Sequence, residues 1–354
     1  MADVLPGAGR SDDSRQAPAE AFPAAGLRRT APGWAARGDV AALDLGTNNC
    51  RMLIARSEGD GFRIVDAFSR VVRLGEGLMA TGRLSEAAIA RALDALAACA
   101  AKLARRRLVQ VRSVATEACR RAANGAAFVA RVYRETGIAL DVISPAEEAR
   151  LAALGCRSLI EADAAQTVVF DIGGGSTEVV LIERGGGPGD LGGDLAISGW
   201  VSIPWGVVSL AETERDDGSE AARLAAYARM RARVSAELWG LAGRLRPGVR
   251  LLGASGTVTT LASVHLGLRH YDRQRVDGCF MDCADLRALG RRLAARPAAE
   301  RAAIPGIGPD RAELVVAGCA ILEALLDATR ADRLRVADRG IREGILRSLL
   351  ACGP

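Results

Sequence analysis

Residues 168–182 read Val168-Val-Phe-Asp-Ile-Gly-Gly-Gly-Ser-Thr-Glu-Val-Val-Leu-Ile182, in which two apolar, strand-like runs flank a glycine-rich turn. Residues 173–175 are glycines, which lack a Cβ, so their backbone N–H groups can approach an anion and their dihedrals can take values that other residues avoid. Asp171 and Glu178 would direct two carboxylates at one point, where a cation or a water molecule could be held beside a phosphate. The alternative is a glycine-rich hairpin with surface acids, because such turns are common.

An earlier segment repeats this plan. Residues 42–56 read Ala42-Leu-Asp-Leu-Gly-Thr-Asn-Asn-Cys-Arg-Met-Leu-Ile-Ala-Arg56. Asp44 aligns with Asp171 and Gly46 with Gly173, at an offset of 127 residues. The repeat predicts two structurally similar halves. Two phosphate-binding hairpins that close on one cleft are stronger evidence for a phosphate-binding site than one hairpin alone.

A third glycine-containing loop follows another short apolar run. Residues 249–261 read Val249-Arg-Leu-Leu-Gly-Ala-Ser-Gly-Thr-Val-Thr-Thr-Leu261. Gly253, Ser255, Gly256 and Thr257 lead into a predicted helix, and the N-terminus of a helix favours negative charge. This loop is therefore a further candidate for phosphate binding.

The composition limits the class of protein. With 354 residues, of which 49% are hydrophobic, the chain can bury a large core, and its length favours two domains. Alternating strand-like and helical segments indicate an α/β fold. The net charge of +5, from 47 basic and 42 acidic residues, does not indicate a nucleic-acid partner. Lys102 is the only lysine and lies outside the three loops, which excludes a P-loop nucleotide site.

The small number of histidines and the spacing of the cysteines exclude other kinds of site. His265 and His270 are the only histidines, too few for a histidine-based phosphatase centre or a histidine-rich metal site. Cys279 and Cys283 lack a second pair that would complete a zinc site, so we expect the eight cysteines to be reduced thiols, mostly buried. No signal peptide or membrane-spanning stretch is evident, which favours a cytoplasmic protein. Residues 1–38 have the composition of a disordered tail.

Hydrophobic periodicity and turn residues outline the remaining elements. We expect a hairpin over residues 39–54, strands over 62–68, 109–115 and 140–144, a helix after Ser85, a helix over 128–137 and a helix from Pro145. Later we expect a glycine-dense loop over residues 185–193, a long helix over 221–245, and helices over 258–266, 284–295 and 311–328. A strand from Leu334, a turn over residues 338–340 and a closing helix complete the chain.

Two pairs of charged residues lie where predicted helices begin. Arg120 and Arg121 follow the strand over residues 109–115; one of them could contact a phosphate, or both could be solvated. Glu147 and Glu148 lie in the first turn after Pro145. They either complement the helix dipole, or one of them enters the cleft and orients a water molecule.

Six segments together resemble the exopolyphosphatase and guanosine pentaphosphate phosphohydrolase family. They are residues 43–54, 115–124, 145–150, 171–178, 253–260 and 337–344, and they occur in the family's order over almost the whole chain after the tail. The motif Asp-x-Gly-Gly-Gly-Ser-Thr-Glu at residues 171–178 makes the match specific. Its terminal Glu separates this family from actin-like proteins and sugar kinases of the same fold.

The resemblance implies a fold and a domain organisation. We expect two ribonuclease-H-like α/β domains of the actin, Hsp70 and sugar-kinase superfold, with the active site in the cleft between them. The first domain would cover residues 39–146, joined by a C-terminal helix over 340–352, and the second residues 147–339. The chain would be a short, two-domain form without the helical extension of the longest members.

The resemblance also suggests roles for individual residues. Glu148 is similar in position to the catalytic base and Glu178 to a second acid beside the attacked phosphorus. Asp171, with Asp44 as its counterpart in the first hairpin, looks like a carboxylate that binds Mg²⁺ or another divalent cation. The predicted phosphate-binding residues are Asn48, Arg120, Gly173, Gly174, Gly175, Ser176, Gly253, Ser255, Gly256 and Thr257. The sequence departs from the family's pattern at two places, and both affect the expected substrate preference. Residues 47–49 read Thr-Asn-Asn where longer members usually read Ser-Asn-Ser, and Glu117 occupies a position where the family often has a small residue.

These features predict a hydrolase that releases terminal phosphate from inorganic polyphosphate, with Glu148 activating water and Mg²⁺ as cofactor. One alternative is a guanosine pentaphosphate 5′-phosphohydrolase of the same family. Others are an ATP-dependent kinase for a small acceptor on the same fold and a non-catalytic regulator that binds alarmone nucleotides. Neither nucleic acid nor a membrane is expected as a partner. A homodimer is an open alternative, because family members are often dimers although no surface in this sequence marks an interface.

Overall fold

The computed structural model describes residues 38–351, apart from residue 60, residues 186–188 and residues 215–217. The expected disordered tail over residues 1–38 therefore lies outside the described residues, except for Gly38. No helix of the described part is long and apolar enough to cross a lipid bilayer. The seven cysteines in this part are free thiols, six of them buried and Cys279 half-buried, which confirms the prediction of reduced thiols for these seven.

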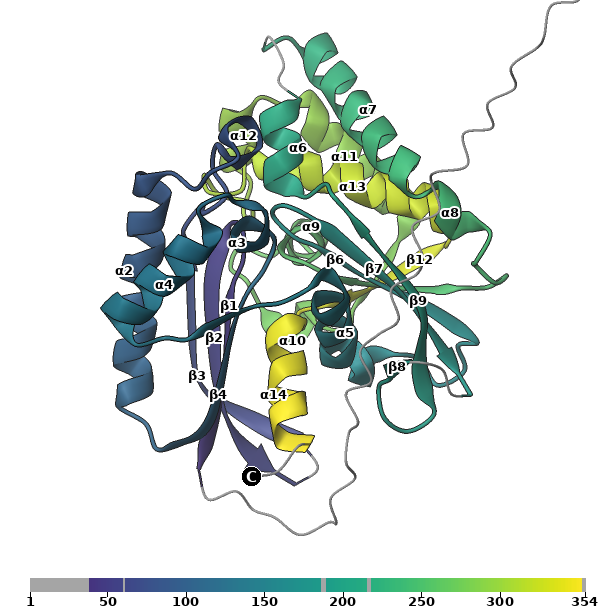
Figure 1. Cartoon of the computed structure of the whole chain (residues 1–354). Coiled ribbons are helices and arrows are strands. Elements are labelled where there is room, and N and C mark those ends of the chain that lie inside the picture. The colour runs from purple at the N-terminus through teal and green to yellow at the C-terminus, as the bar shows by residue number, and fades with distance from the viewer. Residues whose placement is uncertain (1–37, 60, 186–188, 215–217, 352–354) are drawn as a thin grey trace, which may run out of the picture.

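The first half of the described chain forms a five-stranded sheet. Its strands are β1 (Asp39–Leu45), β2 (Asn49–Glu58), β3 (Gly61–Val71), β4 (Leu108–Ala115) and β5 (Leu140–Val142), in the spatial order β3-β2-β1-β4-β5 (Figure 1). β1, β2 and β3 are antiparallel, whereas β4 and β5 join in parallel. The helices that follow these strands are α1 (Leu78–Thr81), α2 (Glu86–Ala104), α3 (Glu117–Arg121) and α4 (Gly125–Thr136). We call this sheet and α1–α4 the first lobe.

The second half forms a seven-stranded sheet. Its strands are β6 (Gln166–Ile172), β7 (Thr177–Arg184), β8 (Gly189–Asp190), β9 (Leu195–Ile203), β10 (Arg250–Ala254), β11 (Phe280–Asp282) and β12 (Arg333–Ala337), in the order β11-β12-β10-β6-β7-β9-β8. The helices are α6 (Val207–Thr213), α7 (Glu220–Glu237), α8 (Trp239–Ala242), α9 (Gly256–His265), α10 (Arg273–Val276), α11 (Cys283–Ala295), α12 (Ala298–Ala302) and α13 (Leu314–Thr329). We call this sheet and α6–α13 the second lobe.

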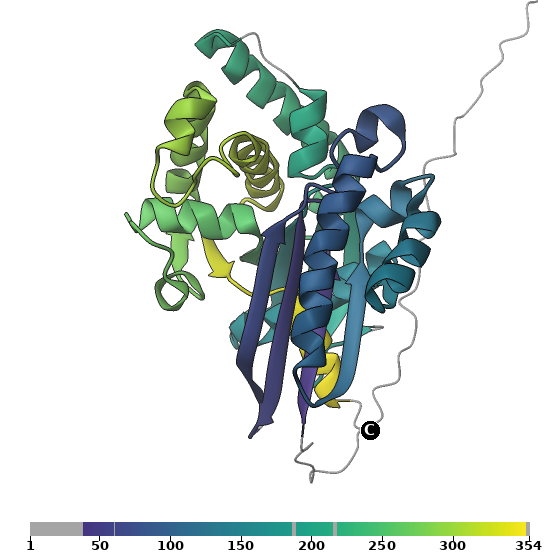
Figure 2. The same cartoon turned by 90° about the vertical axis from the view of Figure 1, so that its left-hand side faces the viewer.

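Each sheet is covered on both faces, because successive residues of a strand point to opposite sides. In β1, Leu43 packs in one core with α2 and α4, whereas Ala42 packs in another with α5 (Pro145–Cys156) and α14 (Ile341–Ala351). In β6, Phe170 packs with α7, α9, α11 and α13, whereas Val169 packs with α5. Figure 2 shows α2 lying along the first sheet, on the face away from α14. The short 3-10 helix η1 (Arg157–Leu159) follows α5.

α5 and α14 lie side by side between the two sheets (Figure 1). Two glycines allow their backbones to approach closely. A Cβ added to Gly344 would lie 1.9 Å from Leu151 O, and one added to Gly155 would lie 2.0 Å from Gly340 O. The C-terminal helix thus packs on the first sheet, while α5 contacts both sheets. The expected domain boundaries at residues 146 and 339 stay a prediction.

Three expectations about individual elements are wrong. The single helix expected over residues 221–245 is divided into α7 and α8 at Leu238, where Gly240 and Gly243 follow and weaken helix propensity. The loop expected over residues 185–193 contains β8, because Gly189 lacks the Cβ that would approach Ile197 Cβ to 2.9 Å in the paired strand β9. The helix expected from residue 311 begins at Leu314.

Candidate active site

The two hairpins expected from the repeat have equivalent backbones. β1 pairs with β2 and β6 with β7, both antiparallel. The turns between them are closed by matching hydrogen bonds: Gly46 N–H donates to Asn49 O at 2.9 Å, and Gly173 N–H donates to Ser176 O at 2.9 Å. The offset of 127 residues therefore corresponds to the same local structure in both lobes.

The paired positions behind the two turns differ in charge. Asp44 is opposite Arg51 in the first hairpin, whereas Asp171 is opposite Glu178 in the second. Arg51 and Glu178 are separated by the same 127 residues as Asp44 and Asp171. The two hairpins together present three carboxyl groups and one guanidinium to the cleft.

The two turns touch each other across the cleft. A Cβ added to Gly174 would lie 2.8 Å from Thr47 Cβ, and one added to Gly175 would lie 2.6 Å from Glu117 Cγ. Residues 173–175 have none of the positive φ angles that other glycines of the chain adopt. The expectation that unusual dihedrals select glycine here is therefore wrong. The close approach of another backbone and of Glu117 excludes a side chain instead.

A cavity of about 580 Å³ lies beside the touching turns and reaches the beginnings of α5, α9 and α14. The predicted site residues that line it are Asp44, Asn48, Glu148, Asp171, Gly173, Gly174, Gly175, Ser176, Glu178, Ser255, Gly256 and Thr257. The fold thus brings together residues from three loops and from the first turn of α5, which are far apart in the sequence. A concave site with convergent polar groups is the usual place for ligand binding.

Four of the carboxyl groups that line this cavity, those of Asp44, Glu148, Asp171 and Glu178, have raised pKa values. Glu148 is 5% exposed and Glu178 is 2% exposed. Burial, together with Glu178 and Asp44, raises the pKa of Asp171 to about 8. Burial raises the pKa of Glu178 to about 7, although hydrogen bonds from two serine hydroxyls oppose this. Burial also raises the pKa of Glu148 and of Asp44. Carboxyl groups with shifted pKa values that gather in a cleft are typical of catalytic sites.

Two predicted phosphate-binding residues do not line the cavity. Arg120 donates from Nη1 to Ile143 O at 2.6 Å and from both Nη atoms to Glu148 Oε2 at 3.2 Å. In this structure Arg120 therefore orients Glu148. Gly253 lies inside β10, where an added Cβ would approach the Phe170 ring to 2.6 Å. Its role here is in strand packing, since a side chain would displace that ring.

Asp44 and Asp171 fit the divalent cation that the sequence predicts. Asp44 Oδ1 is buried and has no hydrogen-bond partner within the described part of the chain. In the same part, no three His, Cys, Asp or Glu side chains are grouped so as to hold a metal ion. Mg²⁺ is commonly bound by one or two carboxylates, with water and substrate phosphates as its other ligands. A pair of aspartates without a third protein ligand matches that pattern.

Further residues that the sequence did not single out also line the cavity, among them Arg51, Tyr271 and Arg342. Arg51 reaches towards the second lobe, because a Cβ added to Gly256 would lie 3.6 Å from Arg51 Nη2. Burial and the positive charge of Arg342 lower the pKa of Arg51. The repeat could have identified Arg51, which stands where the second hairpin has Glu178. Tyr271 and Arg342 reach the cleft only through the packing of α10 and α14.

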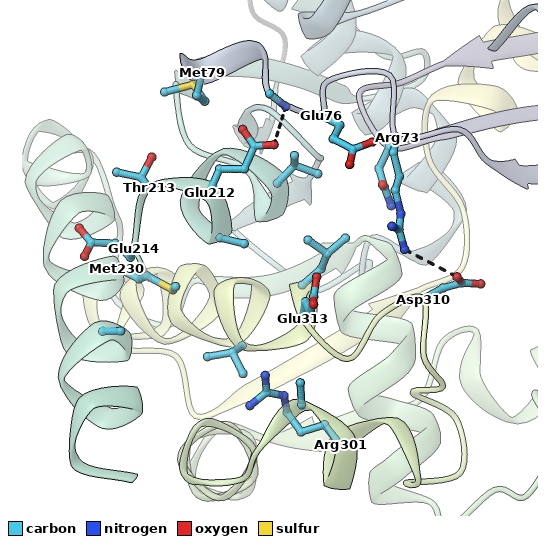
Figure 3. Close-up of a pocket in the computed structure, with 18 of the residues that line it drawn as sticks. Arg73, Glu76, Met79, Glu212, Thr213, Glu214, Met230, Arg301, Asp310 and Glu313 are labelled. Carbon is cyan, nitrogen blue, oxygen red and sulfur yellow. Dashed lines mark hydrogen bonds and ion pairs between the residues drawn. The ribbon is translucent and has the colours of Figure 1, made fainter. Parts of the chain in front are cut away.

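A second cavity, of about 1020 Å³, lies behind the touching turns (Figure 3). It is bounded by the segment between β3 and α2 in the first lobe and by helices of the second lobe, and Asn48 lines both cavities. Five carboxylates (Glu76, Glu212, Glu214, Asp310 and Glu313) and three arginines (Arg73, Arg223 and Arg301) line it. Neither the glycine turn over residues 173–175 nor the start of α9 lines this cavity, so we assign the phosphate site to the first cavity.

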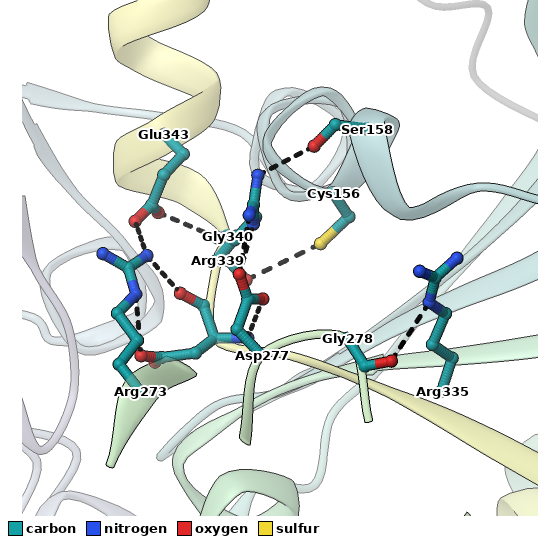
Figure 4. Close-up of polar contacts among 10 residues, drawn as sticks. Cys156, Ser158, Arg273, Asp277, Gly278, Arg335, Arg339, Gly340 and Glu343 are labelled. Carbon is teal, nitrogen blue, oxygen red and sulfur yellow. Dashed lines mark hydrogen bonds and ion pairs between the residues drawn. The ribbon is translucent and has the colours of Figure 1, made fainter. Parts of the chain in front are cut away.

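Polar contacts fix the turn between β12 and α14 against the first cavity (Figure 4). Arg273 Nη2 donates to Asp338 O at 2.7 Å and to Glu343 Oε1 at 3.3 Å, and Glu343 Oε2 accepts from Gly340 N–H at 3.0 Å. Arg339 binds Asp277 on the other side of the turn. This places Gly340 beside Asp171, whose Oδ2 would lie 3.7 Å from an added Cβ.

Comparisons with known proteins agree with this geometry. The model of the Ppx/GppA phosphatase family matches residues 53–352. Exopolyphosphatase 2 of Mycobacterium tuberculosis is 34% identical over 333 residues, which cover 88% of this chain and 98% of that protein. A putative exopolyphosphatase of Haemophilus influenzae is 29% identical over 88% of this chain and 91% of that protein.

Solved structures give the same result. The Aquifex aeolicus member of the Ppx/GppA family is 30% identical with a TM-score of 0.73, over 88% of this chain and 97% of that chain. An exopolyphosphatase from Cytophaga hutchinsonii is 25% identical with a TM-score of 0.78, over the same shares. The expected actin-like, ribonuclease-H-like α/β fold is confirmed. The chain therefore belongs to the Ppx/GppA phosphatase family and is a phosphohydrolase.

Proposed function

We propose that this enzyme hydrolyses the terminal phosphoanhydride bond of inorganic polyphosphate and releases orthophosphate one unit at a time. The observation that carries the proposal is the meeting, in one cavity, of two glycine-containing turns and four carboxyl groups whose pKa values are raised. The names of the Mycobacterium tuberculosis and Cytophaga hutchinsonii relatives support polyphosphate as the substrate class.

Backbone amides supply the contacts to the terminal phosphate. The N–H groups of Gly174 and Gly175 donate to no carbonyl among the described residues, and both glycines line the cavity. Ser176 and the first residues of α9 face the same space, where the positive end of the helix dipole favours negative charge. Asn48 Oδ1 is buried without a partner in the described part, which supports a ligand contact for this side chain as well.

Glu148 accepts the proton of the attacking water. Arg120 binds its Oε2 atom, so Oε1 is the oxygen that takes the proton. Burial and the neighbouring charge of Glu178 raise the pKa of Glu148, which makes it a stronger base. A divalent cation held by Asp44 and Asp171 supplies positive charge to the phosphate oxygens during transfer. Glu178 lies opposite Asp171 in the same hairpin and orients the reacting groups from the other strand.

Guanosine pentaphosphate is the second candidate substrate. Tyr271 is 50% exposed and lines the cavity together with Arg273 and Arg311. An exposed aromatic ring is a surface on which a nucleobase can stack. This arrangement favours a nucleotide over a kinase acceptor as the alternative ligand.

One assay distinguishes these candidate functions. Orthophosphate release is measured from inorganic polyphosphate and from guanosine pentaphosphate, side by side, with Mg²⁺ and with EDTA. We expect faster release from polyphosphate, loss of release with EDTA, and recovery when Mg²⁺ is restored. Faster release from guanosine pentaphosphate would assign the alternative substrate. Tight nucleotide binding without turnover would indicate a regulator, and phosphate transfer from ATP to an acceptor would indicate a kinase. The cytoplasmic location and the homodimer stay predictions.

A further inference from the structure

Carbonyl groups of both phosphate turns accept hydrogen bonds from backbone segments outside the two hairpins. In the first turn, Val72 and Arg73 N–H donate to Asn48 O at 2.9 and 3.0 Å, and Gly75 N–H donates to Thr47 O at 2.9 Å. We call residues 72–77 the first support. It holds the turn of the first hairpin from behind.

The second turn is held in the same way. Val207 N–H donates to Gly173 O at 3.0 Å and Val208 N–H donates to Gly174 O at 2.8 Å. Gly206 packs so closely that an added Cβ would lie 2.4 Å from the carbonyl carbon of Gly174. We call residues 206–212, which include all of α6 except its last residue, the second support. Each support therefore fixes the orientation of one set of phosphate-binding amides.

A single hydrogen bond joins the two supports. Gly77 N–H in the first support donates to Glu212 Oε1 in the second at 2.8 Å, across 135 residues of sequence (Figure 3). Gly77 precedes α1, so the carboxylate of Glu212 also lies at the N-terminal end of that short helix. Arg73 and Asp310 bridge the lobes nearby at 3.9 Å, but their side chains are 50% and 69% exposed, and exposed pairs contribute little.

The surroundings make this bond important for the spacing of the lobes. The second cavity separates the first support from α7 and α13, so side-chain packing does not fix the first support against these two helices. A hydrogen bond to a charged group is stronger than one between neutral groups. Its loss would allow the first support to move, and with it the carbonyls of Thr47 and Asn48.

We propose that Glu212 is a positioning residue that sets the distance between the two phosphate turns by joining their supports. This rests on the proposed function, because it concerns the spacing of the same phosphate-binding amides. Its side chain touches neither substrate nor cofactor. It acts through Gly77, Gly75 and Val208.

The test compares three variants in the full-length protein with tripolyphosphate as substrate. Glu212→Ala removes the acceptor and should raise KM about tenfold, because fewer molecules hold both turns at the binding distance; kcat should fall less than threefold. Glu212→Gln keeps an acceptor oxygen and should stay within about threefold of the wild-type KM. Glu313→Gln is the matched control, because it removes a charge from the same cavity but lies outside both supports.

A second readout does not depend on turnover. Hydrogen–deuterium exchange of the ligand-free proteins should be faster in residues 72–77 and 206–212 of Glu212→Ala. It should be unchanged in Glu313→Gln and, in Glu212→Ala, in helix α4, which does not line the second cavity. If the wild-type protein releases no phosphate from tripolyphosphate, the proposed function fails, but the exchange rates still decide the role of Glu212. Wild-type KM and exchange rates in Glu212→Ala would overturn the proposal, as would faster exchange throughout the chain.

Discussion

At the scale of the residue, Glu148 owes its character to burial and to two neighbouring groups, Glu178 and Arg120. It is buried at the start of α5, faces Glu178, and is held by Arg120 through Oε2. Glu147, the next residue, has a different environment, since Arg112 and Arg150 bind its carboxylate. Two adjacent glutamates in one helical turn therefore take separate roles, one towards the cavity and one towards the first sheet's arginine.

Replacing Glu148 tests the base directly. Glu148→Gln keeps the shape of the side chain and the contact to Arg120 but cannot take a proton. We expect kcat for phosphate release to fall by about 10² or more, with a melting temperature close to that of the wild type. Glu147→Gln is the control and should keep wild-type kcat. Turnover of Glu148→Gln at the wild-type rate would exclude the assigned role.

The contact between the two turns gives a second prediction at this scale. Gly174→Ala places a methyl group 2.8 Å from Thr47 Cβ and 3.2 Å from Asn48 N, so one turn must move. A shift of about 1 Å at a reacting centre can cost about 10² in rate, and we expect kcat/KM to fall by about that factor while the protein stays folded. Gly240→Ala, with open space around its added Cβ, is the control. An unchanged kcat/KM in Gly174→Ala would show that the turns need not touch.

At the scale of the element, the packing of α5 against α14 positions Glu148 and Arg342, which both line the cavity. Gly344→Ala would put a methyl group 1.9 Å from Leu151 O, which a backbone atom cannot easily avoid. Such overpacking typically costs about 1–3 kcal/mol, and urea unfolding should show a loss of this size. Ser348→Ala, on the same helix, should leave the free energy of unfolding nearly unchanged. Equal stability of both variants would contradict the close packing of these helices.

A buried carboxylate joins three helices of the second lobe and gives a pH-dependent prediction. Glu323 in α13 is 2% exposed; it accepts from Tyr227 in α7 at 2.6 Å and from Arg291 in α11 at 2.9 Å. Burial alone would raise its pKa, but these hydrogen bonds lower the pKa of Glu323 below its usual value. Its stabilising effect is therefore present above the pKa of the unfolded chain and is lost as pH falls through the lower, folded pKa.

Glu323→Gln should accordingly be less stable than the wild type at pH 7, by about 1–3 kcal/mol. The difference should shrink as the pH falls below about 4, where the unfolded glutamate is protonated. Urea unfolding at several pH values between 3 and 7 measures this. Asp327→Asn, whose carboxylate is 43% exposed, serves as the control. A difference that stayed constant over this range would contradict the account.

At the scale of the whole molecule, the sequence was sufficient for the fold class and for most of the residues around the cavity. Repeated Asp-x-Gly turns and apolar runs predicted two equivalent hairpins, because both signals are local. The contact of Arg120 with Glu148 could not be predicted, since it depends on how α3 and α5 approach each other. β8 was missed because glycine-rich sequence does not reveal strand pairing. The interruption at Leu238 was missed although Gly240 and Gly243, which weaken helix propensity, follow it. Glu212 and Gly77 meet only in the folded chain.

The central claim is that water attacks the terminal phosphorus of a polyphosphate in the cavity between the two hairpins. A single-turnover reaction of the full-length enzyme with tripolyphosphate and Mg²⁺ in ¹⁸O-labelled water measures this most directly. The account predicts one ¹⁸O atom in the released orthophosphate and none in the pyrophosphate, with the reaction slowed about 10² or more in Glu148→Gln. Label in the pyrophosphate, or no phosphate release by the wild-type enzyme, would contradict it.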